Sequence, residues 1–191
     1  MYSFQTTIHE TSFTFETQPD LFSPRKVDAG TLAMLKSAQL SPGDKLLDLG
    51  CGYGVVGIYA AKILGDSSVS MLDSNPTAIQ CAQNNADLNN VPGVSISLSD
   101  GFRDFHEIGF TRILCNPPYH TDFAVAKHFI LKGFNRLVIG GEFWFVTKRD
   151  KWYGNKLRSI FGFVDSRNVD SYFVLRAVKK QQSFAARKKG R

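Results

Sequence analysis

Residues 45–57 read KLLDLGCGYGVVG, and this stretch decides the fold. Its first part, Lys45 to Leu49, is mostly apolar and predicts a short strand buried in a parallel sheet. A glycine-rich turn follows, and the apolar residues from Val55 to Leu64 predict a helix. A buried strand that passes through glycines directly into a helix is typical of open α/β sheets, which bind ligands at the carboxyl ends of their strands.

The same alternation of strand and helix continues downstream. Further strands are predicted at 69–72, 94–98, 112–115 and 142–147, and helices at 76–88, 123–135 and 153–161. Residues 163–167 and 171–178 then predict an antiparallel pair of strands. We therefore expect an α/β fold with a seven-stranded, mostly parallel sheet, a C-terminal antiparallel hairpin and helices on both faces.

The first 40 residues form an extension that precedes this sheet. Residues 1–20 alternate polar and apolar side chains, which predicts a small N-terminal β-hairpin. Asp28 is placed to cap a helix that runs to about Gln39, with Leu32 and Leu35 on its inner face. We expect one domain over residues 1–178, followed by a basic tail over 179–191.

The composition is that of an ordinary globular protein, with 43% hydrophobic and 21% charged residues. The net charge is +6, and the basic residues of segment 179–191 account for the whole excess. Such a tail attracts nucleic acid, and a solvated terminus is the alternative interpretation.

Several classes of protein are disfavoured by the sequence. No apolar run is long enough to span a membrane, and the N-terminus lacks a signal-peptide pattern. Cys51, Cys81 and Cys115 form no C-x-x-C pair, and the four histidines show no metal-ligand spacing. We expect a cytoplasmic protein with reduced, buried thiols and no metal site.

The glycine turn fits two ligand-binding motifs. Gly52 to Gly57 matches G-x-G-x-x-G, the dinucleotide fingerprint, with Asp73 placed as the ribose-binding acid. Asp48 to Gly54 matches D-x-G-x-G-x-G, a loop that binds S-adenosylmethionine. The charge of Asp48 favours the second motif, because a carboxylate repels a pyrophosphate at the helix start but attracts the sulfonium and ammonium groups of S-adenosylmethionine.

This interpretation assigns cofactor contacts along the carboxyl edge of the sheet. Asp73 is expected to accept hydrogen bonds from both ribose hydroxyls, and Asp100 from the adenine amino group, with the Gly101 N–H beside it. An ordinary turn is the alternative interpretation of Asp100. The predicted cofactor-binding residues are Asp48, Gly50, Cys51, Gly52, Gly54, Asp73, Asp100 and Gly101.

A second motif, Cys115-Asn116-Pro117-Pro118-Tyr119-His120, follows the strand predicted at 112–115. The two prolines fix the backbone directly after Asn116. The Asn116 amide oxygen and the Pro117 carbonyl can then accept both N–H groups of a planar –NH2, while Tyr119 offers a stacking face. Asn116, Pro117 and Tyr119 are the predicted catalytic residues, which act by position and preorganised electrostatics.

These motifs resemble those of the methyltransferase small domain family, whose members include ribosomal RNA guanine-N2 methyltransferases. The resemblance extends over roughly residues 13–178 and includes Leu21-Phe22-Ser23 and Asp28-Ala29-Gly30-Thr31. It implies a Rossmann-like class I methyltransferase that uses S-adenosylmethionine and acts on an exocyclic amino nitrogen, with guanine N2 of ribosomal RNA as the expected substrate. It also implies that the segment with Phe22, Ser23 and Asp28 lies near the methionine end of the cofactor.

The choice of substrate leaves alternatives open. Substrate contacts are predicted for Phe22, Ser23, His120, Lys148 and Arg149. For the last two, a solvated loop is the alternative. The family usually has Phe at the position of Tyr119, whereas glutamine and adenine methyltransferases have Tyr there. A protein glutamine amide and DNA adenine are therefore alternative substrates.

Two other classes of function stay open at the level of sequence. One is an RNA-binding module without activity, which keeps the cofactor site only as a scaffold. The other is a nicotinamide-dependent oxidoreductase, which Asp48 and the Asn-Pro-Pro loop disfavour because hydride transfer needs neither.

Overall fold

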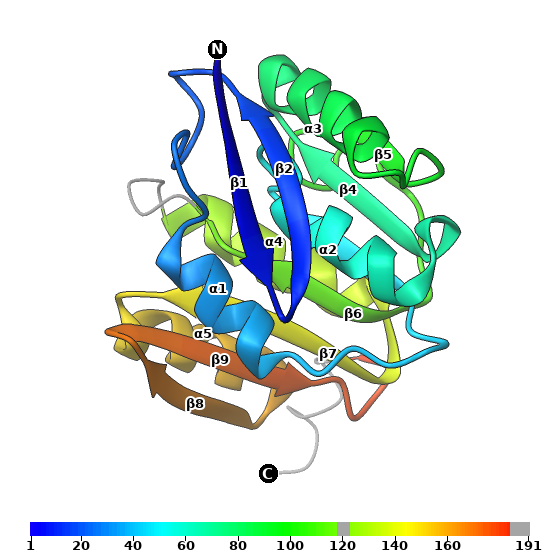
Figure 1. The fold of residues 1–191 in the computed structure, drawn as a ribbon. Coiled ribbons are helices and arrows are strands. Elements are labelled where there is room, and N and C mark those ends of the chain that lie inside the picture. The colour runs from blue at the N-terminus through cyan, green and yellow to red at the C-terminus, as the bar shows by residue number, and fades with distance from the viewer. Residues whose placement is uncertain (118–122, 184–191) are drawn as a thin grey trace, which may run out of the picture.

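The structure is a computed structural model that describes residues 1–117 and 123–183. At its centre is a seven-stranded sheet with the order β5-β4-β3-β6-β7-β9-β8 (Figure 1). The strands are β3 (Leu46–Leu49), β4 (Val69–Asp73), β5 (Ser95–Leu98), β6 (Phe110–Cys115), β7 (Leu137–Thr147), β8 (Val164–Val169) and β9 (Tyr172–Val178). Strands β3 to β7 are parallel, whereas β9 pairs antiparallel with both β7 and β8. The mostly parallel sheet with a C-terminal antiparallel hairpin is therefore confirmed.

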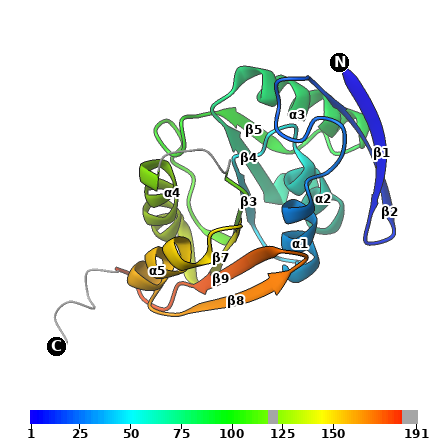
Figure 2. The ribbon, with the colours of Figure 1, turned by 90° about the vertical axis from the view of Figure 1, so that its left-hand side faces the viewer.

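Helices cover both faces of the sheet (Figure 2). One face carries α1 (Ala29–Ser37), α2 (Val55–Leu64) and α3 (Pro76–Leu88), and the other carries α4 (Phe123–Arg136) and α5 (Asp150–Phe161). A short 3-10 helix, η1 (Asp66–Ser68), joins α2 to β4. Among the helices of residues 1–117 and 123–183, none combines the length and the hydropathy that a membrane span requires.

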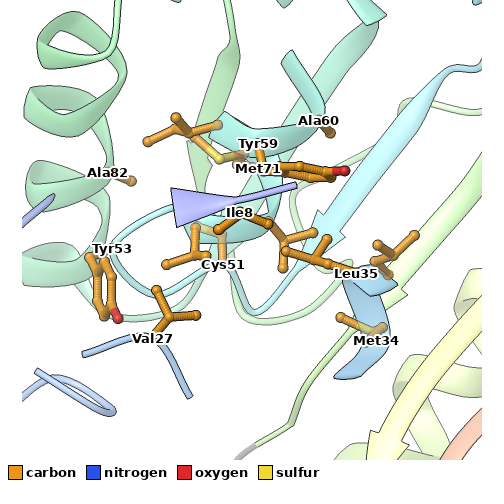
Figure 3. Close-up of a cluster of buried hydrophobic side chains, with 14 of the residues drawn as sticks. Ile8, Val27, Met34, Leu35, Cys51, Tyr53, Tyr59, Ala60, Met71 and Ala82 are labelled. Carbon is orange, nitrogen blue, oxygen red and sulfur yellow. The ribbon is translucent and has the colours of Figure 1, made fainter. Parts of the chain in front are cut away.

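Two hydrophobic clusters fill the space between the sheet and its two helical layers. All four residues of β3 are buried, since helices cover the strand from both sides. Its side chains alternate between the layers, so that Leu46 joins the cluster under α1, α2 and α3, and Leu47 joins the cluster under α4 and α5. Figure 3 shows part of the first cluster, where Ile8 lies among side chains of α1, α2 and β4.

Helix α2 lies unusually close to the sheet at Gly57. A Cβ atom on this residue would come within 2.1 Å of the Met71 Sδ atom on β4, so any larger residue would force the buried Met71 side chain to move. The close approach holds the start of α2, and the glycine turn before it, directly over the ends of β3 and β4.

The predicted N-terminal hairpin is present as β1 (Tyr2–Ile8) and β2 (Thr11–Thr17). Its open β2 edge is covered by two buried asparagines, Asn85 of α3 and Asn89, which directly follows that helix. Asn85 exchanges two hydrogen bonds with the backbone of Glu16, at 2.8 and 2.9 Å, and Asn89 does the same with Thr14, at 3.1 and 2.8 Å. The two side-chain amides thus make the hydrogen bonds that the backbone of a third strand would make, and they fix the hairpin to the main domain.

The orientation of α1 differs from the sequence prediction. Leu35 is buried as expected, but Leu32 is 36% exposed. The buried residues Thr31, Met34, Leu35 and Ala38 follow the i, i+3, i+4, i+7 pattern of a helix face, and Leu32 lies one position off that stripe. The helix also ends at Ser37 and not at Gln39.

The predicted start of the basic tail is wrong for Lys179. This residue is only 5% exposed, and its backbone continues the pairing of β9 with β7 through hydrogen bonds to Gly140 and Gly141. Its Nζ donates to the Leu137 carbonyl at 2.7 Å, and burial lowers the pKa of the ammonium group. Lys179 therefore belongs to the folded domain, whereas residues 184–191 lie outside the described part of the chain.

Candidate active site

A cavity of about 290 Å³ lies at the carboxyl ends of β3, β4 and β6. Among the described residues, its walls come from the segment after the hairpin, the glycine turn, the ends of β4 and β5, Asn116 and one side of α4. This is the edge at which open α/β sheets bind ligands. The structure brings together here most of the residues that the sequence singled out as a site.

The glycine turn uses its own N–H groups to hold the chain in shape. The N–H groups of Gly50 and Cys51 both donate to the Leu72 carbonyl at 2.9 Å, and that of Gly52 donates to Asp73 Oδ2 at 2.8 Å. Gly50 and Gly52 have φ values of +79° and +55°, and a Cβ at either position would meet no atom within 4 Å. These two glycines therefore leave room for a ligand beside the backbone.

Gly54 has a different place from the other two glycines of the motif. It is not among the residues that line the cavity. A Cβ there would lie 3.0 Å from Ile58 and 3.4 Å from Ala82, so its small size allows α2 to pack against α3. The predicted cofactor contact of Gly54 thus has no support in the cavity geometry, whereas Gly50, Cys51 and Gly52 all line it.

Asp48 lies at the end of β3 with its carboxylate in the cavity wall. The side chain is 3% exposed, and its Oδ2 accepts the Gly57 N–H at 2.9 Å. Burial raises the pKa of this carboxyl from 3.8 to about 7, the Gly57 hydrogen bond opposes the rise, and the charge of Asp73 adds to it. A cation bound in the cavity would favour the ionised form of Asp48.

Asp73 ends β4 and is held by two backbone donors. Its Oδ2 accepts the Gly52 N–H at 2.8 Å and its Oδ1 accepts the Asn75 N–H at 2.9 Å. Each oxygen keeps further acceptor capacity, and the carboxylate lines the cavity. This arrangement suits the predicted acceptance of two hydroxyl groups.

Asp100 and Gly101 line the cavity at the end of β5. Asp100 forms an exposed ion pair with Arg103 at 3.1 Å, which is worth little because solvent screens it. Gly101 has a φ of +62°, and a Cβ there would lie 2.9 Å from the Phe129 ring of α4. The turn that was the alternative interpretation of Asp100 is thus present, and it does not remove Asp100 from the cavity wall.

The Asn116 amide is held by two residues of the N-terminal segment. Its Nδ2 donates to Asp28 Oδ2 at 3.0 Å and to Thr31 Oγ1 at 2.9 Å. Its Oδ1 is buried and has no hydrogen-bond partner among the described residues. An acceptor at the cavity wall is therefore left for a ligand donor, which is what the sequence argument required of this side chain.

The remaining predicted residues fall into three groups. Phe22 and Ser23 line the cavity, whereas Pro117 is buried and is not itself a lining residue, although it directly follows Asn116, which is. Lys148 and Arg149 are exposed before α5 and do not line it, and Lys148 Nζ lies 5.0 Å from the centre of the Tyr172 ring. Tyr119 and His120 lie outside the described residues.

Several cavity residues were missed by the sequence argument. Tyr53 donates its hydroxyl to the carbonyls of Ser23 and Lys26, at 3.2 and 3.3 Å, which ties the N-terminal segment to the glycine turn. Val125 and Phe129 of α4 lie four residues apart and form an apolar wall. That spacing is visible in the sequence, but only the packing shows that it faces a cavity.

The charge of the cavity indicates the kind of ligand that it takes. Asp28, Asp48, Asp73 and Asp100 line it, and no lysine or arginine is among the described residues that do. Of the four, Asp100 pairs with Arg103 outside the cavity wall. Uncompensated acids suit a cationic ligand and repel a pyrophosphate. These carboxylates therefore fit S-adenosylmethionine. The fold and the site together define a class I methyltransferase that uses this cofactor.

The chain belongs to the methyltransferase small domain family, whose model matches residues 12–176. It is 28% identical to YbxB of Bacillus subtilis, over 87% of this chain and 86% of that protein. It is 32% identical to ribosomal RNA large subunit methyltransferase G of Aeromonas hydrophila, over 84% of this chain and 44% of the relative. The chain thus spans less than half the length of this relative.

One solved structure is similar over nearly the whole chain. It is the 16S rRNA N2 G1207 methyltransferase RsmC of T. thermophilus, in complex with AdoMet and guanosine. The TM-score is 0.86 at 28% sequence identity, and the match covers 94% of this chain and 50% of that one. Family and fold together confirm the predicted methyltransferase and its cofactor, S-adenosylmethionine.

Proposed function

We propose that this protein transfers the methyl group of S-adenosylmethionine to an exocyclic amino nitrogen of RNA, with guanine N2 of ribosomal RNA as the substrate. The observation that carries the proposal is the buried Oδ1 atom of Asn116, a residue at the wall of an acidic cavity, which has no hydrogen-bond partner among the described residues. An exocyclic amino group has N–H donors for such an acceptor and a lone pair for the methyl group.

The cofactor would be held along the edge of the sheet. Asp73 would accept the ribose hydroxyls, Gly50 and Gly52 would allow the cofactor to lie against the backbone, and Asp48 would face its positive groups. When bound, S-adenosylmethionine supplies an electrophilic methyl group on a sulfonium.

The chain itself positions the nucleophile. Asn116 Oδ1 accepts one N–H of the amino group, and the Pro117 carbonyl is proposed to accept the other, so the nitrogen lone pair is directed at the methyl carbon. The nitrogen gains positive charge as its bond to the methyl carbon forms and the bond between that carbon and sulfur breaks, and this charge strengthens both hydrogen bonds. The amine then loses a proton to water, and no strong general base is needed.

The distribution of charge supports a nucleic acid as the partner. Residues 123–161 contain eight lysines and arginines and two acids, whereas residues 1–122 contain seven basic and 13 acidic residues. Helices α4 and α5 lie side by side on one face of the sheet (Figure 2). Lys127 and Lys132 on α4, and Lys151 and Arg158 on α5, are all exposed. This basic face adjoins the cavity, which α4 helps to line, so RNA bound along it would reach the site.

The choice of guanine is supported by the similarity to an enzyme solved with guanosine and named for guanine N2. The choice of ribosomal RNA is supported by relatives named as ribosomal RNA methyltransferases. A ribosomal substrate also agrees with the cytoplasmic location expected from the sequence.

The test is a transfer assay with tritium-labelled S-adenosylmethionine. Intact ribosomal subunits, their naked RNA and a protein extract are taken from cells that lack this gene, and the labelled product is identified after digestion. We expect N2-methylguanosine from one ribosomal RNA. Labelled N-methylglutamine would instead identify a glutamine amide as the substrate, and labelled N6-methyladenosine would show that the base is adenine and not guanine. Cofactor binding without transfer to any acceptor would favour the scaffold.

A further inference from the structure

The way in which Asn116 is held suggests a second layer of the site. Asp28 Oδ2 accepts two hydrogen bonds, one from the Thr31 N–H at 3.0 Å and one from Asn116 Nδ2 at 3.0 Å. Thr31 Oγ1 accepts the other Asn116 Nδ2 hydrogen at 2.9 Å. The first of these bonds is the ordinary cap of α1, but the bonds to Asn116 connect residues 88 and 85 positions apart.

These contacts decide which way the amide points. Both hydrogens of Asn116 Nδ2 are used, which leaves the opposite atom, Oδ1, as a buried acceptor without a partner among the described residues, on a side chain that lines the cavity. A flipped amide would place its oxygen against the Asp28 carboxylate and lose that hydrogen bond, because an ionised carboxylate only accepts, whereas the Thr31 hydroxyl can pair with either end of the amide. The acceptor is therefore oriented before any substrate arrives.

The position of Asp28 is itself fixed by contacts from the far end of the chain. The Tyr172 hydroxyl at the start of β9 lies 3.4 Å from Asp28 Oδ1. Gly30 leaves space for both groups, since a Cβ there would lie 2.7 Å from the Tyr172 ring and 2.9 Å from Asp28 Oδ2. Three distant segments thus meet around one amide.

We propose that Asp28 and Thr31 are positioning residues for methyl transfer, which orient the Asn116 amide and raise the acceptor strength of its oxygen. A carboxylate that accepts from an amide N–H polarises the amide, so more negative charge resides on Oδ1. This inference rests on the proposed function of Asn116 and adds to it a role for the N-terminal segment beyond capping α1.

The first test reads the amide without any substrate. In a nitrogen–proton correlation spectrum, the Nδ2 protons of Asn116, assigned by their loss in Asn116→Asp, are expected downfield and protected from exchange with water. Thr31→Val removes one acceptor at nearly constant volume and should shift one of the two signals and speed its exchange. Thr31→Ser keeps the acceptor and should preserve both.

The second test is the single-turnover rate of methyl transfer at saturating cofactor, on the RNA that accepts methyl groups in the assay above. Thr31→Val should lower the rate roughly 10-fold and Asp28→Ala roughly 100-fold. The conservative variants Thr31→Ser and Asp28→Asn should retain much of the wild-type rate. The affinity for S-adenosylhomocysteine should change far less than the rate in the Thr31 variants.

Thr111→Val is the matched control. Thr111 lies at the other end of β6, and its hydroxyl donates to Asp44 Oδ1 at 2.7 Å. Its replacement should cost stability but leave the rate unchanged. Equal rates for Thr31→Val and Thr31→Ser, or unprotected Nδ2 protons in the wild type, would overturn the inference. Full activity of Asn116→Ala would instead overturn the proposed function, while the spectrum would still report on the orientation.

Discussion

The two ends of the parallel strands carry similar acids but pair them differently. At the amino ends, Glu107 forms an ion pair with Lys45 at 2.8 Å and accepts the Ser70 hydroxyl at 2.7 Å. Glu142 pairs with Arg176, lies 3.6 Å from Arg112 and accepts the Trp144 N–H. Burial would raise the pKa of both carboxyls, but these donors and cations lower it instead.

At the carboxyl ends, the acids of the site are held mainly by neutral donors. Asp48 and Asp73 accept hydrogen bonds from backbone N–H groups. Asp28 accepts one from the Thr31 backbone N–H and one from the Asn116 side-chain amide. Burial without a cation raises the pKa of Asp48 to about 7. Removal of an acid that is paired within the protein costs stability because its cation is left uncompensated, whereas an acid left without a cation at a cavity is available to a ligand.

This difference predicts that substitutions at the carboxyl end reduce binding and catalysis, and that substitutions at the amino end reduce stability. Asn116→Ala is expected to have the largest effect, because it removes a preorganised acceptor that matters most in the transition state. We expect methyl transfer to slow by roughly 100- to 1,000-fold, with cofactor affinity little changed. Tyr119→Ala should mainly weaken RNA binding, and Tyr119→Phe should be nearly silent.

Rates measured under single-turnover conditions and cofactor affinity from calorimetry separate these effects. Asn84→Ala, at an exposed asparagine of α3 on the opposite face of the sheet from α4 and α5 (Figure 2), is the control and should behave as the wild type. Intact turnover in Asn116→Ala would contradict the expectation that substitutions at the carboxyl end of the sheet reduce catalysis.

Asp73→Ala comes next in size. We expect it to weaken the binding of S-adenosylmethionine by about 1.5–3 kcal/mol, the usual cost of losing charge-assisted hydrogen bonds. Asp66→Ala is a close control, because Asp66 also accepts two backbone N–H groups, from Ser67 at 2.8 Å and Gly93 at 2.9 Å, away from the cavity. Calorimetry on both variants should show a loss of affinity only for Asp73→Ala, and tight NAD binding by the wild type would contradict the assignment.

Glu142→Ala tests the amino end of the sheet. It leaves Arg112 and Arg176 without their shared carboxylate, and we expect a loss of roughly 1–3 kcal/mol in the free energy of unfolding. Because the folded pKa of Glu142 is lowered, this stabilisation is present above the unfolded pKa near 4.5 and is lost as the pH falls through the folded value. Denaturant unfolding at pH 7 and pH 4 measures it, and unchanged cofactor affinity is expected.

The pH dependence of binding tests Asp48. Its folded pKa is about 7, so a cationic ligand that favours the carboxylate must displace a proton below that pH. We expect the affinity for S-adenosylmethionine to rise by up to tenfold per pH unit toward pH 7 and then to level off. For the same reason, the free protein should lose stability as the pH rises from about 4 through 7, because the neutral form of Asp48 is favoured in the folded state.

Calorimetry in two buffers of different ionisation enthalpy counts the released proton. Asp48→Asn should abolish the release and flatten the profile. A wild-type affinity that is independent of pH, without proton release, would show that the Asp48 carboxylate does not face the positive groups of the cofactor.

The smallest effect is expected from the basic residues outside the site. Removing residues 184–191 deletes four positive charges, and we expect the slope of log affinity for RNA against log salt to become shallower by at most about 3. Lys132→Glu with Arg158→Glu tests the face formed by α4 and α5, and Lys36→Glu with Lys62→Glu on the opposite face is the control. Equal slopes for the two double variants would contradict the basic face as the path of RNA.

The sequence by itself determined most of what depends on neighbouring residues. Hydrophobic periodicity and caps such as Asp28 placed the strands and helices, because those signals operate within a few turns of chain. The charge of Asp48 beside three glycines identified the class of cofactor, since the strand-turn-helix unit that joins them is local. Asp48, Asp73 and Asn116 each lie at the carboxyl end of a predicted strand. Because the strands were predicted to be parallel, the three residues were expected at one edge of the sheet.

Only the tertiary structure decided the contacts between distant segments. The Asn116 amide is oriented by Asp28 and Thr31, the hairpin is held by Asn85 and Asn89, and Lys179 continues β9 into the core. Each of these side chains is polar, and in the sequence each has a simple local role as a cap, a helix residue or a tail charge. Their partners lie tens of residues away, so the energy of each contact depends on a packing geometry that no local pattern encodes.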